Sequence, residues 1–152
     1  MGVIYLDSGI LVDLLLGSNT RRLAIKSIIA GKKRATSVIS FGEVLYVATA
    51  LSAERIYGNR GRSAVRKFIK NRHVDYLTLY ESVKDLYSLL NIEILPHPKT
   101  EIMDGLIEKY KLPPRDLIHA ATAIENKCSQ FLTLDSDFKQ IKEGIKVAII
   151  EN

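Results

Sequence analysis

The sequence predicts an α/β fold, a three-layer α/β/α sandwich in which helices cover both faces of a five-stranded parallel sheet. Five short runs are apolar at both alternating positions, which is typical of strands buried on two faces. Segments with helical periodicity separate these runs, and strands that alternate with helices form parallel sheets. The chain has 152 residues, the size of one domain, so residues 1–152 are expected to form a single unit.

Each expected element has its own signal. The five apolar runs are Val3–Leu6, Ala35–Val38, Ile92–Leu95, Phe131–Leu134 and Val147–Ile150. A helix is expected to start near Ser8, and apolar residues recur at helical spacing around Val44, Val83, Met103 and Leu117. Pro113 and Pro114 mark the start of the last of these helices, because proline suits a first helical turn. The segment Gly58-Asn59-Arg60-Gly61 predicts a break between two helices.

Composition excludes several classes of protein. No apolar run reaches the roughly 18 residues that a membrane-spanning helix needs, and no basic leader precedes Ile10–Leu16, so neither a membrane anchor nor a signal peptide is expected. The single cysteine, Cys128, rules out an internal disulfide and favours the reducing cytoplasm. One cysteine and three scattered histidines do not predict a zinc site.

Positive charge is concentrated in two stretches of the chain. The net charge is +5, yet residues 14–42 hold six basic residues and no acid, and residues 53–73 hold seven basic residues and one acid. Basic segments suggest a polyanionic partner, although a solvated helix face explains them equally well. The candidates for such contacts in the second stretch are Arg55, Arg62, Arg66 and Lys67.

Four acidic residues fall at related places. Asp7 and Asp135 follow the first and fourth apolar runs, while Glu43 and Asp116 begin helices. Ligands of open parallel sheets bind at the carboxyl ends of the strands. We therefore expect the four side chains to meet at that edge of the sheet.

Each of these acids also has a local explanation as a helix cap. Asp7 and Asp135 are placed to cap the helices that follow them, and Ser40 and Glu43 have the spacing of a capping box. Asp116 lies in a first helical turn, where the helix dipole favours an anion. The sequence leaves the cap and the ligand interpretations open.

A cluster of carboxylates predicts a hard divalent cation. Neighbouring carboxylates repel and raise one another's pKa values, and a bound cation relieves this repulsion. Mg²⁺ and Mn²⁺ prefer oxygen ligands and support phosphate chemistry. Beside basic segments, an all-oxygen site suggests metal-dependent hydrolysis of nucleic acid.

Four segments of the chain resemble the four motifs of PIN-domain ribonucleases, in particular the small prokaryotic proteins typified by VapC toxins. The segments are Tyr5-Leu6-Asp7-Ser8, Ser40-Phe41-Gly42-Glu43-Val44, Asp116-Leu117-Ile118-His119-Ala120-Ala121-Thr122-Ala123 and Thr133-Leu134-Asp135-Ser136-Asp137-Phe138. The last two motifs in this order are the most specific. One departure is Gly9, which stands where the family commonly has Asn after the hydroxyl residue.

The resemblance implies a five-stranded parallel sheet, Mg²⁺ or Mn²⁺, and cleavage of single-stranded RNA by in-line attack of water. It implies that Asp7, Asp116 and Asp135 hold the metal, and that Glu43 holds a second metal or orients water. Ser8 would be the hydroxyl neighbour of this site. Asp137 is the rival of Asp135 two residues away; the end of the strand favours Asp135 as the ligand, with Asp137 in a supporting position. For a toxin, the resemblance also implies a small cognate antitoxin and a homodimer; the lack of a long apolar run predicts no membrane partner.

Two alternatives to a toxin nuclease remain at this point. A PIN fold can serve as a catalytically silent module that binds RNA or protein, because fold does not determine function. A housekeeping RNA-processing nuclease would have much the same sequence. His119 shares a helix face with Asp116 and is expected to be structural rather than a general base. The helical tyrosines are expected to pack rather than to stack on bases.

Overall fold

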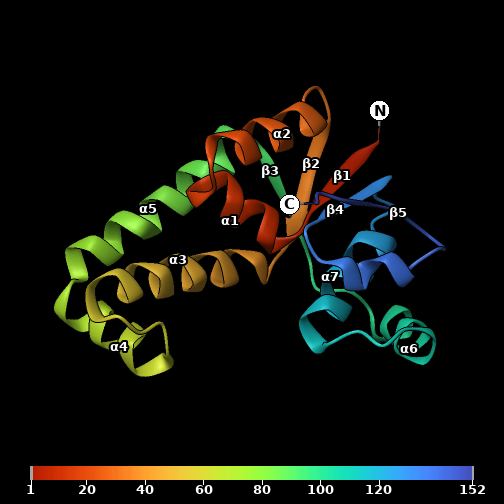
Figure 1. Cartoon of the computed structure of the whole chain (residues 1–152). Coiled ribbons are helices and arrows are strands. Elements are labelled where there is room, and N and C mark those ends of the chain that lie inside the picture. Colours follow the sequence, from red (N-terminus) through yellow and green to blue (C-terminus); the bar gives the residue numbers. More distant parts are fainter. Residues whose placement is uncertain (1, 152) are drawn as a thin grey trace.

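The computed structural model, which describes residues 2–151, contains the predicted parallel sheet between two layers of helices (Figure 1). The strands are β1 (Val3–Leu6), β2 (Lys33–Ser37), β3 (Ile92–Leu95), β4 (Gln130–Thr133) and β5 (Lys146–Ile149). Their order is β3-β2-β1-β4-β5, and every neighbouring pair is parallel. The predicted runs for β2, β4 and β5 are displaced by one or two residues, because polar residues such as Lys33, Gln130 and Lys146 pair in the ladder before the apolar part begins.

Eight helical segments connect and cover the strands. They are α1 (Ser8–Leu16), α2 (Asn19–Ile29), α3 (Ser40–Tyr57), α4 (Arg62–Asn71), α5 (His73–Leu89), α6 (Thr100–Lys109), α7 (Pro114–Glu125) and the 3₁₀ segment η1 (Ser136–Gln140). Within residues 2–151, no helix is both long enough and apolar enough to cross a bilayer.

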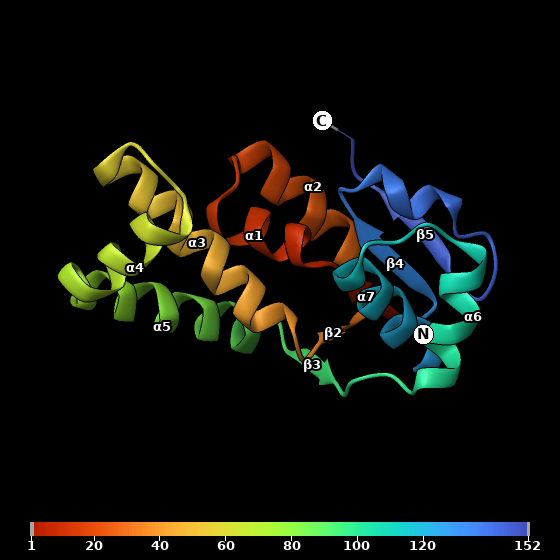
Figure 2. The same ribbon diagram turned by 90° about the horizontal axis from the view of Figure 1, so that it is seen from below.

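Two apolar cores confirm the three layers. On one face of the sheet, Tyr5 and Phe131 pack with the alanines of α7 and with Phe138 of η1. On the other face, Ile4 and Leu132 pack with α1, α2, α3 and α5. Successive residues of β1 thus enter opposite cores, as the alternation of side chains along a strand requires. Figure 2 shows α6 and α7 on one side of the sheet and α1 and α3 on the other.

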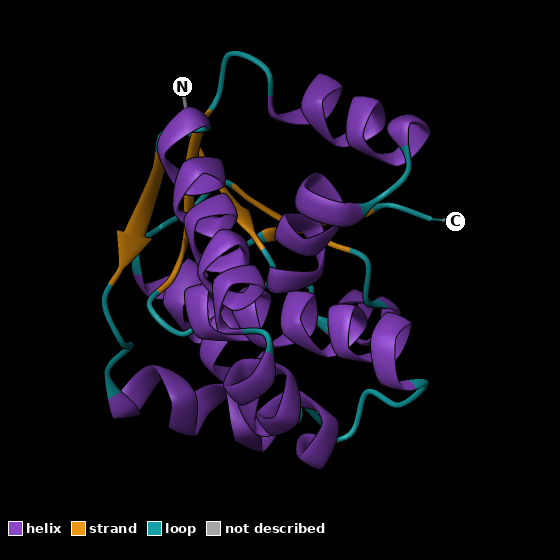
Figure 3. Ribbon diagram, turned by 90° about the vertical axis from the view of Figure 1, so that its left-hand side faces the viewer, coloured by secondary structure: helices purple, strands orange, loops and turns teal. Residues whose placement is uncertain are grey.

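The long helices α3 and α5 extend beyond the sheet and form an arm with α4 packed at its far end (Figures 1 and 2). Seen from the side toward which the arm points, helices lie in front of the strands (Figure 3). A small third core of Ala53, Ala64 and Phe68 holds α4 in place. The predicted break is confirmed: Gly58 ends α3 in the left-handed conformation with φ of 70°, which glycine adopts without steric cost. The arm therefore carries its tip away from the sheet.

Arg34 of β2 joins the ends of two helices from opposite parts of the chain. Its guanidinium donates to the carbonyl of Ile29, at the end of α2, over 3.2 Å, and to that of Leu90, just after α5, over 3.0 Å. A cation near a helix C-terminus is favourable because the last carbonyls lack partners within the helix.

We expect Arg34→Met to lower the free energy of unfolding by about 1–3 kcal/mol, since both carbonyls lose a charged donor. Urea or thermal denaturation measures this change. Lys33→Met, at the exposed neighbouring position, is the matched control and should change stability by no more than about 0.5 kcal/mol. Equal effects of the two variants would contradict a role for the two carbonyl contacts.

Candidate active site

The four acids expected at the carboxyl edge of the sheet line one open cleft of about 270 Å³. The cleft is bounded by the ends of β1 and β4 and by the first turns of α1, α3 and α7. Its lining residues are Asp7, Ser8, Gly9, Glu43, Arg115, Asp116, His119, Leu134 and Asp135. A Cβ atom added at Gly9 would meet Leu134 at an ordinary contact distance of 3.5 Å, so this glycine keeps the cleft open without being sterically required.

Asp7 is held at the end of the central strand. Its side chain is buried, accepting a hydrogen bond from the backbone N–H of Ser8 over 2.9 Å and one from the hydroxyl of Thr133 over 2.7 Å. Burial raises the pKa of Asp7, and the His119 ring together with the Thr133 hydroxyl offsets part of that effect. Asp7 thus caps α1 and faces the cleft at the same time.

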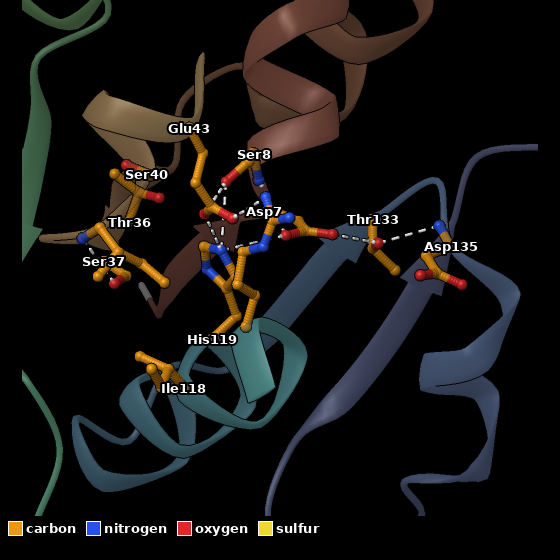
Figure 4. Close-up of polar contacts among 12 residues, drawn as sticks. Asp7, Ser8, Thr36, Ser37, Ser40, Glu43, Ile118, His119, Thr133 and Asp135 are labelled. Atoms are coloured by element: carbon orange, nitrogen blue, oxygen red, sulfur yellow. Dashed lines mark hydrogen bonds and ion pairs between the residues drawn. The ribbon is translucent and has the colours of Figure 1, made fainter. Parts of the chain in front are cut away.

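Glu43 and His119 form the best-connected part of the site (Figure 4). His119 Nε2 lies 2.6 Å from Glu43 Oε1, and its Nδ1 lies 2.6 Å from the hydroxyl of Tyr5. Ser8 Oγ donates to the same Glu43 oxygen over 2.8 Å. Burial opposes the charge of Glu43, but the hydrogen bonds from His119 and Ser8 outweigh it and lower the pKa of Glu43.

His119 is buried, as expected of a structural histidine, but it also joins the acidic residues. Only 1% of it is exposed, and both ring nitrogens have partners. Its contact with a carboxylate is not among the contacts predicted from the sequence. The available signal was its position three residues after Asp116, on the same face of α7.

The expected capping box at the start of α3 is absent. The N-cap is Ile39, the Ser40 hydroxyl bonds the hydroxyl of Tyr87, and Glu43 turns to Ser8 and His119. Ser40 and Tyr87 are both buried, and pairing satisfies their two hydroxyls at once. The first turn of α3 therefore directs its acid into the cleft instead of back to its own backbone.

Among the four acids that line the cleft, Asp116 has the least support from hydrogen bonds. Among residues 2–151, its carboxylate has no hydrogen-bond partner, and α7 begins after Pro113 without a side-chain cap. Burial, reinforced by the nearby charges of Asp135 and Asp7, raises the pKa of Asp116 to about 6. Its position therefore suits a cation better than the role of helix cap.

Asp135 and Asp137 lie next to Asp116. Asp135 caps η1 by accepting from the backbone N–H of Asp137 over 2.8 Å. One carboxylate oxygen from each of Asp116, Asp135 and Asp137 lies within 4.8 Å of the other two. Asp137, weighed against Asp135 as a ligand and expected in a supporting position, is thus as close to Asp116 as a metal ligand would be. Asp7 belongs to the cleft but not to this group of three.

The donor set fits a hard divalent cation. Its atoms are carboxylate oxygens, which Mg²⁺ and Mn²⁺ prefer, and both nitrogens of the nearby histidine are already engaged. Asp116 and Asp135 are common to the cleft and to the group of three acids. These two side chains are consequently the centre of the candidate metal site, with Asp7 and Asp137 on either side.

The basic residues proposed for nucleic-acid contact lie apart from this cleft. Arg55 is twelve residues along α3 from Glu43, a distance of about 18 Å at the rise of an α-helix. Arg62, Arg66 and Lys67 are on α4, where Lys67 Nζ lies 4.5 Å from the centre of the Tyr57 ring. The basic residue that lines the cleft is Arg115, whose Nη1 is 3.4 Å from Glu43 Oε2 and which sequence analysis missed.

Solved structures with the same fold come from bacterial toxin–antitoxin complexes. The VapBC2 complex from Rickettsia felis, bound to a DNA fragment from its promoter, aligns with a TM-score of 0.65 at 14% identity over 97% of this chain and 98% of that chain. A toxin–antitoxin complex from Klebsiella pneumoniae aligns with a TM-score of 0.58 at 21% identity over 93% and 94% of the two chains. At these identities the alignments establish the shared fold.

Sequence comparison extends the agreement from the fold to a family. Among curated proteins, none matches the chain in sequence. The PIN domain family, in contrast, matches residues 4–144. This range begins within β1, includes β2, β3 and β4, and contains every acid of the cleft. The chain therefore belongs to the PIN domain family.

Proposed function

We propose that this protein is a Mg²⁺- or Mn²⁺-dependent endoribonuclease and the toxin of a toxin–antitoxin pair in the cytoplasm. The observation that carries the proposal is Asp116, a carboxylate beside Asp135 and Asp7 that lacks a hydrogen-bond donor and has a pKa raised to about 6. An acid in that setting is stabilised by a cation. Membership of the PIN domain family supports the same conclusion.

The residues of the cleft have distinct parts in the proposed hydrolysis. Asp116 and Asp135, together with Asp7, would hold the divalent ion, which when bound lowers the pKa of water and stabilises charge on the phosphodiester. Glu43 is kept ionised by its hydrogen bonds. Its carboxylate can therefore accept a hydrogen bond from an attacking water molecule and orient that molecule. Arg115 lies at the mouth of the cleft, 74% of its side chain is exposed, and it can pair with a phosphate.

The proposed partners follow from charge and from the structural neighbours. Both neighbours are toxin–antitoxin complexes, which supports a small antitoxin that covers the acidic cleft, and a homodimer is part of the same proposal. The basic residues of the arm support RNA binding away from the cleft. A catalytically silent binding module is less well supported, because it has no use for the unpaired carboxylate of Asp116.

Asp116→Asn should lower the rate of cleavage of a labelled single-stranded RNA by about 10²–10³-fold, since it removes a charge from the metal site. Asp104→Asn, at an exposed acid of α6, is the control and should retain the wild-type rate. Gel or fluorescence assays with Mg²⁺, Mn²⁺ and EDTA measure these rates. Cleavage that persists at full rate in EDTA would refute the metal-dependent mechanism.

Asp116→Asn should also raise the melting temperature of the metal-free protein at pH 7.5. Burial and the neighbouring carboxylates raise the folded-state pKa of Asp116 to about 6, above the ordinary aspartate value of 3.8. Its ionisation therefore destabilises the fold progressively between these two pH values and to the full extent above pH 6. We expect a gain of about 1 kcal/mol, discounted because solvent screens this half-buried group. The gain should shrink as the pH falls below 6 and vanish at about pH 3, where the wild-type group is protonated in both the folded and the unfolded state.

The same melts with Mg²⁺ provide the second half of this test. Mg²⁺ should stabilise the wild type by mass action and the variant much less. If Asp116 only stabilised the start of α7 through the helix dipole, the metal-free variant would melt lower and both proteins would respond equally to Mg²⁺.

Replacing Arg62, Arg66 and Lys67 together with alanine should weaken RNA binding and flatten its dependence on salt. Each lost phosphate contact should reduce the slope of log K against log salt by about 0.7 for a single strand. Fluorescence anisotropy in the Asp116→Asn background measures binding without cleavage. The control with the same change in charge is alanine at the exposed residues Lys26, Lys33 and Lys142; an equal effect there would indicate nonspecific attraction.

A further inference from the structure

We propose that Tyr5 and His119 act together as positioning residues: the Tyr5 hydroxyl holds His119 in the tautomer with its proton on Nε2, and Nε2–H orients Glu43. This inference rests on the proposed function of the cleft, because Glu43 is the group being positioned. Neither residue needs to touch the substrate. Their role follows from hydrogen bonds that join three elements of the fold.

The geometry is a chain of short contacts from the core to the cleft. Tyr5, on the central strand β1, is fully buried, and its hydroxyl is 2.6 Å from His119 Nδ1 on α7. His119 Nε2 is 2.6 Å from Glu43 Oε1 on α3. These pairs are separated by 114 and 76 residues in the sequence, so the chain of contacts exists only when the sheet and both helices are assembled.

The chemistry of the partners assigns each proton. Glu43 is ionised, so its oxygens only accept hydrogen bonds, and Nε2 at 2.6 Å must carry a proton. A neutral imidazole then has a lone pair on Nδ1, which accepts from the Tyr5 hydroxyl. Burial and the nearby Asp7 charge raise the pKa of Tyr5, so this hydroxyl keeps its proton for donation. The opposite tautomer would place two lone pairs face to face at Glu43.

The consequence is that Glu43 has one oxygen fixed and one available. Oε1 receives both His119 Nε2–H and the Ser8 hydroxyl, while Oε2 faces Arg115 at the cleft. A glutamate at the start of a helix otherwise samples several rotamers. Fixing Oε1 therefore aims Oε2 at the space where water and phosphate would lie.

Nitrogen NMR tests the tautomer without any catalysis. Long-range ¹H–¹⁵N spectra of the metal-free full chain with ¹⁵N-labelled histidine should show His119 with Nε2 protonated and Nδ1 unprotonated. The His119→Gln variant identifies the signals, because His73 and His97 remain. In Tyr5→Phe, which keeps the ring stacked on Phe131 at 5.0 Å, the His119 signals should shift toward a mixture of tautomers.

Kinetics test the effect on Glu43. Tyr5→Phe should lower kcat about tenfold with KM within about twofold of wild type, as expected for one lost positioning hydrogen bond. His119→Gln keeps an N–H that can reach Glu43 and should retain more activity than His119→Ala. In the His119→Gln background, Tyr5→Phe should cause no further loss of kcat, because the chain of hydrogen bonds from Tyr5 to Glu43 is already interrupted.

Tyr110→Phe is the matched control, since Tyr110 packs against the same apolar core as Tyr5 but does not line the cleft. It should change neither the His119 signals nor kcat. The proposal is overturned if wild-type His119 carries its proton on Nδ1 or on both nitrogens, or if Tyr5→Phe leaves the tautomer and kcat unchanged. If the protein lacks ribonuclease activity but gives the expected NMR result, the proposed function is refuted while the proposed hydrogen bonds from Tyr5 through His119 to Glu43 are supported.

Discussion

The buried carboxylate of Asp7, at the end of the central strand, is the constraint on which most of the site depends. A charge removed from water is costly unless hydrogen bonds or opposite charges replace the lost hydration. The lost hydration of Asp7 is replaced by hydrogen bonds from the Thr133 hydroxyl of the neighbouring strand and from the Ser8 N–H, and by the nearby His119 ring. They come from β4, α1 and α7, so satisfying one carboxylate fixes the relative positions of three elements around the cleft.

The capping and site roles of these acids are compatible in this fold. Asp7 and Asp135 each use carboxylate oxygens to cap the following helix, and both line the cleft. The first turns of α1, α3, α7 and η1 all meet at the carboxyl edge of the sheet, and the positive ends of helix dipoles reduce the repulsion among the acids. The helix dipoles do not remove this repulsion, and the pKa of Asp116 is still raised to about 6.

The separation of the acidic cleft from the basic arm bears on the proposed substrate. Compact phosphate ligands would fill the cleft and reach Arg115, but would not extend to α4. An extended polyanion such as single-stranded RNA can contact both, since its charges repeat along its length. The arm is tied to the rest of the fold by α3, whose first turn carries Glu43 and whose last turn packs beneath α4. The helix that positions an acid of the cleft thus also sets the distance to the basic surface.

The amino-acid sequence is enough to predict the strands, the parallel sheet, the helix break at Gly58 and the edge at which Asp7, Glu43, Asp116 and Asp135 gather. These features depend on periodicity, on turn residues and on the rule that parallel strands end at one edge, all of which act over short stretches of chain. The folded chain alone shows that His119 links Tyr5 to Glu43, that Ser40 bonds Tyr87 instead of capping α3, and that α4 lies far from the cleft. The place of α4 depends on the packing of Ala64 and Phe68 against Ala53 near the end of α3. The other two outcomes depend on hydrogen bonds between residues 47 to 114 positions apart, for which a single sequence contains no periodic signal, because each partner's local pattern is the same whether or not the bond forms.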